Sequence, residues 1–403
     1  MQQNFDEKIL DQVSYVTGSR NLACILSNIP AKHPFEERTI AFLNDVSKAL
    51  LTDPEARRFS DVITFGFWIR KGSILKLRDC FEETGSFRLG RGVVFHIAPS
   101  NVPVNFAYSL VAGILTGNAN IVRIPTKDFE QVKIIVRAWN HVLEQYEDMK
   151  PYSLLVRYGR EKEINDMFSS FSDVRIVRGG DATIAELRKS PMPSRSSEIT
   201  FADRYSLAVI DADYYLEQTD KAKVAKDFYN DTFLTDQNAC TSPRIIVWSG
   251  NRIEEAKTEF WKRLHCLVKE RYVIQPVQSV NKLASTCLIA ARMPGCKIIE
   301  AQDNLIVRVV VPEIFRDLME YKDNSGYFFE YDCADIMELR DLCDNKRCQT
   351  IAYIGDKDMV LPLIRAGVKG IDRVVPVGTT MDFDLIWDGY YLPALLTRTV
   401  AMK

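Results

Sequence analysis

The sequence lacks the features of a membrane-spanning, secreted or nucleic-acid-binding protein. No run approaches the roughly 18–20 apolar residues that a helix needs to cross a bilayer, and the richest stretch, 106–115, is interrupted by Ser109 and Gly113. Neither sign of charge dominates, because 52 Lys and Arg face 54 Asp and Glu. The N-terminus has neither the basic start nor the apolar centre of a signal peptide. We therefore expect a cytoplasmic protein with no membrane span and no nucleic-acid partner.

Metal-site and disulfide patterns are also missing. The nine cysteines are scattered without CxxC spacing, and an odd count in a chain this long indicates reduced thiols rather than a disulfide framework. The four histidines stand alone, so we expect no metal site. The glycine fingerprint GxGxxG of dinucleotide-binding folds is absent, since Gly90–Arg91–Gly92 precedes its predicted strand instead of following it.

What is present is an alternation of short apolar runs and helical patterns. The first 85 residues read as mostly helical, and the alternation begins near residue 90. Strands are predicted at 92–99, 120–125, 153–159, 174–180, 205–211, 244–250, 349–355 and 373–378, and 296–311 reads as a pair of strands. Strands that alternate with helices indicate βαβ units and parallel sheets. We predict an α/β fold with a cofactor-type domain at 1–205, a second α/β domain at 206–376 and a packing or oligomerisation tail at 377–403.

The first candidate for chemistry is Cys240, in the segment DTFLTDQNACTSPRIIVW (231–248). It lies in a polar loop between a predicted helix and a buried strand. A loop on a rigid frame can expose a thiol and surround it with backbone donors, which suits a nucleophile. A small buried hydrophobe is the alternative, since most free cysteines are of that kind. The spacing alone leaves both interpretations open.

Two further segments follow predicted strands. Asn101, in IAPSNVPVNF (97–106), can direct its amide into a cleft as an oxyanion donor, or it can serve as a turn or cap residue. Gly179 and Gly180 join a strand to a helix, where glycine lets the backbone approach a phosphate. Asp181, the next residue, is expected to cap that helix rather than to face a phosphate.

A third segment carries positive charge beyond the second strand. Arg123, Thr126 and Lys127 could bind a ribose or its 2′-phosphate. A solvated basic loop is the alternative, and the two interpretations carry about equal weight.

These motifs in this order resemble the aldehyde dehydrogenase superfamily. PSN (99–101) and DQNACTSPRIIV (236–247) match its asparagine and cysteine segments. Within the superfamily, FADRYSLAVID (201–211), KRCQTIAYIG (346–355) and above all MDFDLIWDGY (381–390) look like the LuxC-type acyl-CoA (fatty acid) reductases. The resemblance covers roughly residues 85–395.

The resemblance implies a Rossmann-like cofactor domain and a catalytic domain that carries the nucleophile. Cys240 would be that nucleophile and Asn101 an oxyanion donor. Gly179 and Gly180 would lie along the pyrophosphate or nicotinamide of the cofactor, and the segment 123–127 would meet its adenosine ribose.

Two departures from the superfamily pattern bear on the reaction. Phe201 stands where aldehyde-oxidising members carry the glutamate that activates water, which favours reduction of an acyl-enzyme over its hydrolysis. Glu198 lies three residues upstream and is the alternative base. Ile124 replaces the lysine of the adenosine loop, and two neighbouring cations, Arg123 and Lys127, favour NADPH.

The resemblance thus implies NADPH-dependent reduction of an acyl thioester to an aldehyde through a cysteine acyl-enzyme. The substrate would be an acyl-CoA or a carrier-bound acyl group, supplied in some cases by an acyl-transferring or acyl-activating partner protein. A homo-oligomer is expected because superfamily relatives usually form dimers or tetramers. The alternatives are an acylphosphate reductase like the γ-glutamyl phosphate enzymes, an aldehyde dehydrogenase acting through Glu198, and a non-catalytic subunit of a complex.

Overall fold

The computed structural model describes residues 7–82, 87–99, 102–300 and 303–402. The chain forms two compact units: unit 1 comprises residues 1–202 and 390–403, and unit 2 comprises residues 203–389. Both units combine sheets with helices, so the predicted α/β class is confirmed. The three-part domain division at 205/206 and 376/377 stays a prediction.

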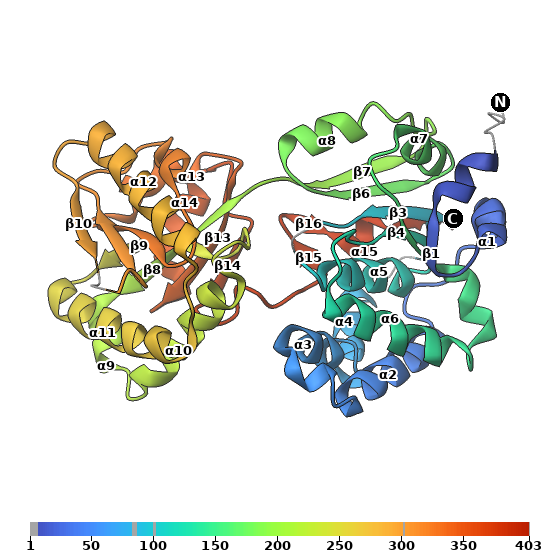
Figure 1. Ribbon diagram of the computed structural model, residues 1–403, viewed down its shortest axis with the longest axis horizontal. Coiled ribbons are helices and arrows are strands. Elements are labelled where there is room, and N and C mark those ends of the chain that lie inside the picture. Colours follow the sequence, from blue (N-terminus) through green and yellow to red (C-terminus); the bar gives the residue numbers. More distant parts are fainter. Residues whose placement is uncertain (1–6, 83–86, 100–101, 301–302, 403) are drawn as a thin grey trace. The chain divides into compact units, whose positions relative to one another are not determined.

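Unit 1 contains a six-stranded sheet in which only the edge strand β1 is antiparallel (Figure 1). All five residues of β3 are buried, as expected of a parallel strand covered on both faces. In spatial order the strands are β1 (Ser14–Thr17), β5 (Ser153–Arg157), β4 (Ala119–Arg123), β3 (Val93–Ile97), β6 (Val174–Arg178) and β7 (Ser197–Phe201).

The strand order of unit 1 reverses direction once. From β3 the chain proceeds to β4 and β5 on one side, and it then crosses to β6 and β7 on the other side. In open parallel sheets such a reversal is where ligands bind, at the carboxyl ends of the strands. The reversal lies between β3 and β6.

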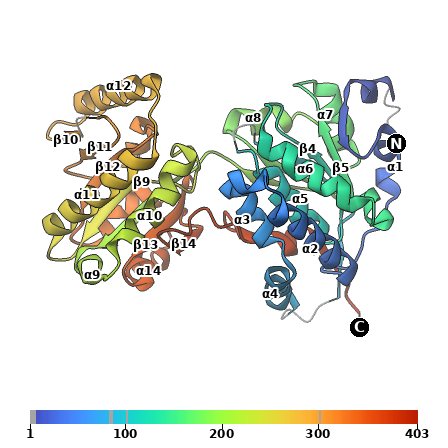
Figure 2. The same ribbon diagram turned by 60° about the horizontal axis from the view of Figure 1, so that its bottom comes forward.

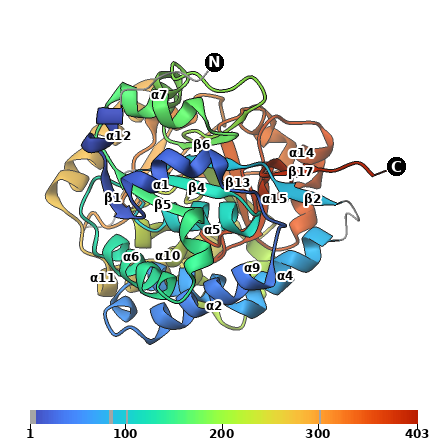
Figure 3. The same cartoon turned by 90° about the vertical axis from the view of Figure 1, so that its right-hand side faces the viewer.

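Helices cover both faces of this sheet (Figures 1 and 3). Helices α5 and α6 lie on one face, with α2 and α3 packed beyond them, and α7 and α8 lie on the other. The bounds are α1 (Arg20–Ile25), α2 (Glu37–Thr52), α3 (Ser60–Trp68), α4 (Lys71–Glu82), α5 (Asn105–Leu115), α6 (Glu130–Leu143), α7 (Lys162–Ser170) and α8 (Asp181–Leu187). The mostly helical start predicted for the chain is confirmed apart from β1.

The C-terminal segment belongs to unit 1. After β16 (Tyr390–Tyr391) and α15 (Leu392–Leu395), β17 (Thr397–Thr399) pairs antiparallel with β2 (Arg88–Gly90), as Figure 3 shows. Arg91 Nε donates to Leu395 O at 2.6 Å, which adds to the backbone pairing of the two strands.

Unit 2 contains a seven-stranded sheet in which only the edge strand β10 is antiparallel (Figure 2). The paired strands predicted within 296–311 are β10 and β11. In spatial order the strands are β10 (Lys297–Glu300), β11 (Val307–Val310), β12 (Tyr327–Asp332), β9 (Pro243–Ser249), β8 (Tyr205–Asp211), β13 (Cys348–Ile354) and β14 (Arg373–Pro376). A further short strand, β15, covers Ile386–Trp387.

The two faces of the unit 2 sheet carry separate cores. Helices α9 (Ala212–Glu217), α10 (Lys221–Thr232) and α11 (Ile253–Arg271) cover one face. Helices α12 (Pro276–Arg292), α13 (Arg340–Cys343) and α14 (Leu361–Arg365) cover the other (Figure 1). The helix predicted over 213–230 is split, because Asp220 caps α10 by accepting from Lys223 N at 2.9 Å. The sequence pattern predicted neither α12 nor β12.

Short 3₁₀ helices connect the larger elements. They span Glu7–Gln12, Leu26–Asn28, Ala56–Arg58, Glu147–Tyr152, Phe233–Thr235, Leu318–Tyr321, Ile336–Leu339 and Lys357–Val360. Within the described ranges, no helix has both the length and the apolar character that crossing a bilayer requires.

A polar network is buried beneath α5. The ring of His96 lies between Ser109 Oγ at 2.8 Å and Asn120 Oδ1 at 2.9 Å. The Asn120 amide nitrogen donates to two carbonyls, so its Oδ1 accepts from His96 Nε2 and the Ser109 hydroxyl donates to Nδ1. A Cβ at Gly113 would lie 1.8 Å from Asn120 Oδ1, so only glycine lets α5 approach this network.

We predict that His96 makes unit 1 sensitive to acid. Burial lowers the pKa of His96 from 6.5 to about 4, so between these values the unfolded chain binds a proton that the folded chain does not. Stability is therefore lost as the pH falls from about 6.5 to 4, by about 3 kcal/mol for this group. Urea unfolding at several pH values should show a steeper loss for the native chain than for His96→Gln. Equal slopes would contradict the prediction.

Candidate active site

Cys240 lies in the loop between the 3₁₀ helix Phe233–Thr235 and β9. Its side chain is partly exposed, whereas Cys333, Cys343 and Cys348 are buried. Because the loop precedes β9, Cys240 lies at the amino end of the parallel strands. The usual ligand site of an open α/β sheet is at the opposite, carboxyl end. A reactive group in this loop must therefore be positioned by the contacts of the loop itself rather than by the carboxyl ends of the strands.

The loop has an unusual backbone just before the cysteine. Asp236 and Gln237 both adopt left-handed conformations, with φ of 50° and 60°. Such conformations cost of order 1–3 kcal/mol each and persist only where the surroundings enforce them. Asp236 accepts from Tyr272 Oη at 2.6 Å, and its carbonyl accepts from Ser325 N at 3.0 Å.

The buried side-chain amide of Gln237 supplies the strongest constraint. Its Nε2 donates to Pro243 O at 3.0 Å and to Tyr327 O at 3.1 Å. Its Oε1 accepts from Gly326 N at 3.0 Å and from Tyr327 N at 3.2 Å. Since Pro243 begins β9 and Tyr327 begins β12, one amide joins the Cys240 loop to two neighbouring strands.

Helix α12 supports the same loop from the side. Lys282, which is 1% exposed, donates to Ser325 O at 2.9 Å, and Ser285 Oγ donates to Asp323 Oδ2 at 2.8 Å. Ser325 and Asp323 in turn hold the Cys240 loop, through Asp236 O and through the guanidinium of Arg244. The position of the loop therefore depends on contacts from several elements of unit 2.

Two guanidinium groups place positive charge near Cys240. Arg244 donates to three neutral oxygens, Gln237 O at 2.6 Å, Asp323 O at 2.7 Å and Asn324 Oδ1. Burial lowers the pKa of Arg244, and the neighbouring Asp203, Cys240 and Asp323 act to raise it. Burial also lowers the pKa of Arg373, and Asp388, Asp384, Asp382 and Cys240 act to raise it. A buried cation favours an anionic neighbour, and Cys240 shares both cations with these carboxylates.

The MDFDLIWDGY segment, 381–390, packs beside this loop. Thr241 Oγ1 contacts Met381 Sδ at 3.2 Å, and the Arg373 guanidinium lies 4.3 Å from the centre of the Trp387 ring. Arg373 also donates to Thr380 O at 3.1 Å. Arg373 was not among the predicted site residues, because an arginine at the start of a strand gives no signal without knowledge of what surrounds it.

The candidate cofactor residues gather at one edge of unit 1. In the sheet register, Ile97 of β3 pairs with Arg123 of β4 and with Val177 of β6. The loops that follow these three strands therefore begin side by side at the carboxyl edge, at the reversal of strand order. They contain Thr126 and Lys127, the segment that includes Asn101, and Gly179–Gly180. Asn101 itself lies outside the described residues. Cys240 belongs to unit 2.

The space in front of Gly180 is open. A Cβ built at Gly180 would meet nothing within 4 Å, so the fold of the chain does not itself require glycine there. At Gly179 a Cβ would lie 3.2 Å from Thr183 Cγ2, and Gly179 N donates to Phe201 O at 3.1 Å. An open approach to the backbone at the end of β6 suits a pyrophosphate.

The two predicted cations of the adenosine loop differ in orientation. Arg123 points back into the protein: it donates to Tyr158 O at 3.4 Å and to Gly159 O, and its guanidinium lies 4.6 Å from the Tyr158 ring centre. Lys127 and Thr126 are exposed. Lys127 therefore has the greater access to a ligand.

The alternative base, Glu198, is held by two arginines. Its carboxylate accepts from Arg175 and from Arg188, the latter at 2.7 Å, and the Arg175 side chain is almost fully buried. A carboxylate bound by two guanidiniums is a poor general base. Phe201, which the resemblance places at the position of the superfamily glutamate, is 6% exposed and lies beneath the Arg178 guanidinium at 3.9 Å.

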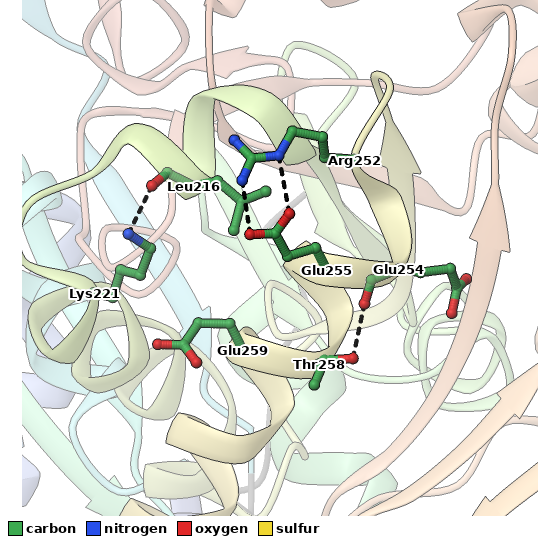
Figure 4. Close-up of a pocket in the computed structure, with 7 residues that line it drawn as sticks. All are labelled: Leu216, Lys221, Arg252, Glu254, Glu255, Thr258 and Glu259. Atoms are coloured by element: carbon green, nitrogen blue, oxygen red, sulfur yellow. Dashed lines mark hydrogen bonds and ion pairs between the residues drawn. The ribbon is translucent and has the colours of Figure 1, made fainter.

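A polar cavity of about 580 Å³ occurs elsewhere in unit 2, between α9, α10 and α11 (Figure 4). Two of its cationic side chains already have partners: Lys221 donates to the backbone carbonyl of Leu216 at 2.7 Å, and Arg252 donates to the Glu255 carboxylate at 2.7 Å. None of the predicted site residues lines it. The cavity therefore has no part in the candidate site.

Comparison with known proteins gives the following family and relatives. The family model described as "Acyl-CoA reductase (LuxC)" matches residues 71–308. The long-chain acyl-protein thioester reductase of Vibrio harveyi is 26% identical over 365 residues, which cover 89% of this chain and 71% of that protein. The reductase of the same name from Aliivibrio fischeri is 23% identical over 335 residues, which cover 82% of this chain and 66% of that protein.

Solved structures show the same fold. An NAD-dependent benzaldehyde dehydrogenase from Corynebacterium glutamicum superposes with a TM-score of 0.60 at 15% identity, covering 90% of this chain and 84% of that one. Aldehyde dehydrogenase 21 from Physcomitrella patens gives a TM-score of 0.59 at 14% identity, covering 96% and 86%. The predicted aldehyde dehydrogenase-like fold is confirmed.

We predict that Gln237→Leu loosens the Cys240 loop. The substitution leaves buried backbone groups of Pro243, Gly326 and Tyr327 without their partner, and each such group costs about 1–3 kcal/mol. We expect the free energy of unfolding to fall by roughly 3 kcal/mol or more. Hydrogen exchange at the Gly326 and Tyr327 amides should accelerate. Asn238→Ala, an exposed neighbour in the same loop, should change stability by no more than about 0.5 kcal/mol. Equal effects of the two variants would refute this account.

Proposed function

Because the chain belongs to the acyl-CoA reductase (LuxC) family, whose members are oxidoreductases, we propose that it reduces an acyl thioester to an aldehyde through an acyl-enzyme on Cys240, with NADPH as cofactor. The observation that carries the proposal is the environment of Cys240. A partly exposed thiol lies in a constrained loop, and it shares the electrostatic influence of the buried guanidinium groups of Arg244 and Arg373 with several carboxylates.

The first step is transfer of the acyl group to the enzyme. The Cys240 thiolate attacks the thioester carbonyl carbon, a new carbon–sulfur bond forms, and the bond to the carrier sulfur breaks. The carrier leaves as a thiolate and takes up a proton. We assign the Cys240 backbone N–H and the Asn101 side-chain amide as donors to the oxyanion that develops. A donor of this kind is worth about 100–1000-fold in rate.

The residues of unit 1 fit a nicotinamide cofactor. The open backbone at Gly180 lies at the end of β6, where the strand order reverses, and the exposed Lys127 and Thr126 follow β4. When bound there, NADPH would supply the hydride that the reduction of the acyl-enzyme requires. Gly179 and Gly180 would admit the pyrophosphate, and Lys127 with Thr126 would meet the ribose 2′-phosphate. Arg123 would support this loop from behind rather than bind the phosphate.

Reduction is favoured over hydrolysis because no base is available where the superfamily carries its glutamate. Phe201 has no proton-accepting group, and the Glu198 carboxylate is occupied by Arg175 and Arg188. An acyl-enzyme at Cys240 is thereby protected from attack by activated water. We assign acyl-CoA or a carrier-bound acyl group as substrate, and an acyl-transferring or acyl-activating protein as a possible supplier.

We predict that Cys240→Ala abolishes acylation without unfolding the protein. Intact-protein mass spectrometry after incubation with a panel of acyl-CoAs should show an acyl adduct on the native chain, located at Cys240 by peptide mapping. Addition of NADPH should discharge it as aldehyde. The control is Cys266→Ala, an exposed cysteine of α11, which should acylate normally.

An acyl adduct on Cys240→Ala, or aldehyde production by that variant, would refute the covalent mechanism. Adduct formation from an acyl phosphate but from no thioester would replace the proposal with an acylphosphate reductase.

We predict that Lys127→Ala discriminates between the two nicotinamide cofactors. Loss of one charge-assisted contact to the 2′-phosphate, worth about 1.5–3 kcal/mol, should raise KM for NADPH about 10–100-fold. KM for NADH and kcat should change little. Lys150→Ala, an exposed lysine of the same unit that pairs with Glu147, is the matched control. An equal rise for NADPH and NADH, or no rise for either, would exclude this role of Lys127.

A further inference from the structure

A buried carboxylate next to the Cys240 loop has no part in the chemistry proposed so far. Asp231 lies in the last turn of α10 and is 1% exposed. Its Oδ2 accepts from Gly378 N at 2.6 Å, and its Oδ1 accepts from Thr380 N at 3.1 Å. One side chain of α10 therefore holds the backbone turn 378–380, which follows β14.

Arg373 holds the same turn through its carbonyl groups. The guanidinium donates to Thr380 O and to Asp382 O, each at 3.1 Å. The amide groups of the turn are thus bound by the carboxylate of Asp231, and the carbonyl groups at its end are bound by Arg373. The turn and the Arg373 guanidinium are therefore fixed together.

The turn reaches the residues beside Cys240. Met381 follows Thr380, and its Sδ lies 3.2 Å from Oγ1 of Thr241, the residue after Cys240. The Arg373 guanidinium and Cys240 also influence one another electrostatically. A shift of the turn would therefore displace a contact of the cysteine loop and one of its cations.

The helix that carries Asp231 is bonded directly to the Cys240 loop. Thr232 ends α10, and its carbonyl accepts from Gln237 N at 2.8 Å. Asp231 therefore sets the position of the turn relative to a helix end that already holds the loop. The C-terminal end of α10 anchors both segments.

This place is costly for a negative charge. Burial raises the pKa of Asp231 to about 7, and Asp382 acts in the same direction. The hydrogen bonds from Gly378 and Thr380 lower the pKa by less. The negative end of the α10 dipole also disfavours a carboxylate, and an asparagine would fill the same space without a charge. A carboxyl group kept beside a reactive cysteine at this cost indicates a functional role.

A second acid of α10 borders the same turn. Asp227 lies one helical turn before Asp231 and pairs with Lys223. A Cβ built at Gly378 would lie 2.6 Å from Asp227 Cβ. Asp227 is therefore the matched control for Asp231.

The proton on Asp231 decides how many backbone amides it can hold. In the carboxylate both oxygens accept hydrogen bonds, whereas in the carboxylic acid one oxygen carries a hydrogen. Either Gly378 N or Thr380 N then loses its acceptor. The turn is therefore fixed at both amides only while Asp231 is ionised.

We propose that Asp231 is a positioning residue for acyl transfer to Cys240, and that its ionised carboxylate fixes the turn 378–380 so that Met381 and Arg373 are held against the cysteine loop. The proposal rests on the proposed role of Cys240 as nucleophile. Protonation of Asp231 then loosens the turn and slows acylation as the pH falls through the neutral range.

Acylation of Asp231→Asn tests the proposal. Asparagine has one acceptor oxygen and presents N–H groups to the second amide, as the protonated acid does. Intact-protein mass spectrometry with an acyl-CoA in excess gives the rate of the first acyl transfer from about pH 5.5 to 9. We expect the variant to be about tenfold slower than the native chain at the upper end of this range. At the lower end, where the native Asp231 is protonated, the two rates should agree.

Asp227→Asn removes the same charge one helical turn earlier and should follow the native profile. Loss of the Cys240 thiolate at low pH slows all three proteins alike, so the ratio of their rates isolates the effect of Asp231. A ratio that stays constant with pH would mark a merely structural contact and would overturn the proposal. A native rate for Asp231→Asn at high pH, or equal slowing by Asp227→Asn, would overturn it as well.

Alkylation separates this proposal from the proposed reaction. If the native chain is acylated at no pH, the proposed function is wrong, and the rate at which iodoacetamide labels Cys240 replaces the acylation rate. Labelling should show the same pH-dependent gap between the native chain and Asp231→Asn, because Arg373 acts on the thiol whatever its substrate is. Equal labelling rates at every pH would refute the positioning role.

Hydrogen exchange of the native chain is a further measurement that needs no variant. After correction for the intrinsic exchange rate, the protection of the Gly378 and Thr380 amides should increase about tenfold as the pH rises through about 7. Protection that does not change with pH would contradict the proposal, even if Asp231→Asn failed to fold.

Discussion

The buried amide of Gln237 is the interaction on which the candidate catalytic centre depends. The Cys240 loop lies at the amino end of a parallel sheet, away from the carboxyl strand ends that usually position ligand-binding groups. It also contains two successive left-handed residues. The amide offsets both disadvantages, because its two N–H groups and its oxygen, which accepts twice, bond at 3.0–3.2 Å to the backbone of Pro243, Gly326 and Tyr327 where β9 and β12 begin. A side chain with one fewer donor or acceptor would leave a buried backbone group unpaired. Cys240 follows three residues later, so its position depends on these hydrogen bonds. Arg244 donates to the Gln237 carbonyl and adds positive charge nearby.

The two sheets present their functional candidates at opposite ends, and the reason lies in chain direction. In unit 1, Thr126, Lys127, Gly179 and Gly180 follow their strands, so the register of β4, β3 and β6 brings their loops to the carboxyl edge at the reversal of strand order. In unit 2 the cysteine precedes its strand, so side chains from the starts of other strands surround it: Ser206 at β8 donates to Cys240 O at 2.7 Å, and Arg373 at β14 supplies charge. One edge is open to a ligand along the backbone, and the other is crowded with side chains that hold and surround Cys240.

Much of the fold and of the candidate site could be predicted from the sequence, and the remaining features depend on contacts between distant segments. Apolar runs located the buried strands, and the loop position of Cys240 followed from them. Residues 276–292 gave no helix prediction, because the pattern of α12 mixes an apolar exposed face with a buried lysine, and the usual rule of apolar inside and polar outside does not apply. The inward turn of Arg123 depends on carbonyls 35 and 36 residues away, and the pairing of Glu198 depends on Arg175 in the neighbouring strand. Such contacts leave no local signal.

Lys282 explains why α12 could acquire an apolar surface without losing its place in the fold. A helix whose inward face is held only by hydrophobic contact can rotate to bury a more apolar side. Here the inward face carries an ammonium group that donates to Ser325 O at 2.9 Å and a hydroxyl that donates to Asp323 Oδ2 at 2.8 Å. Rotation would expose these acceptors and strip a buried charge of its partners, at a cost of several kcal/mol. Polar contacts thus fix the rotation of the helix, and its outer residues take no part in holding it. The same contacts connect α12 to the loop of Cys240.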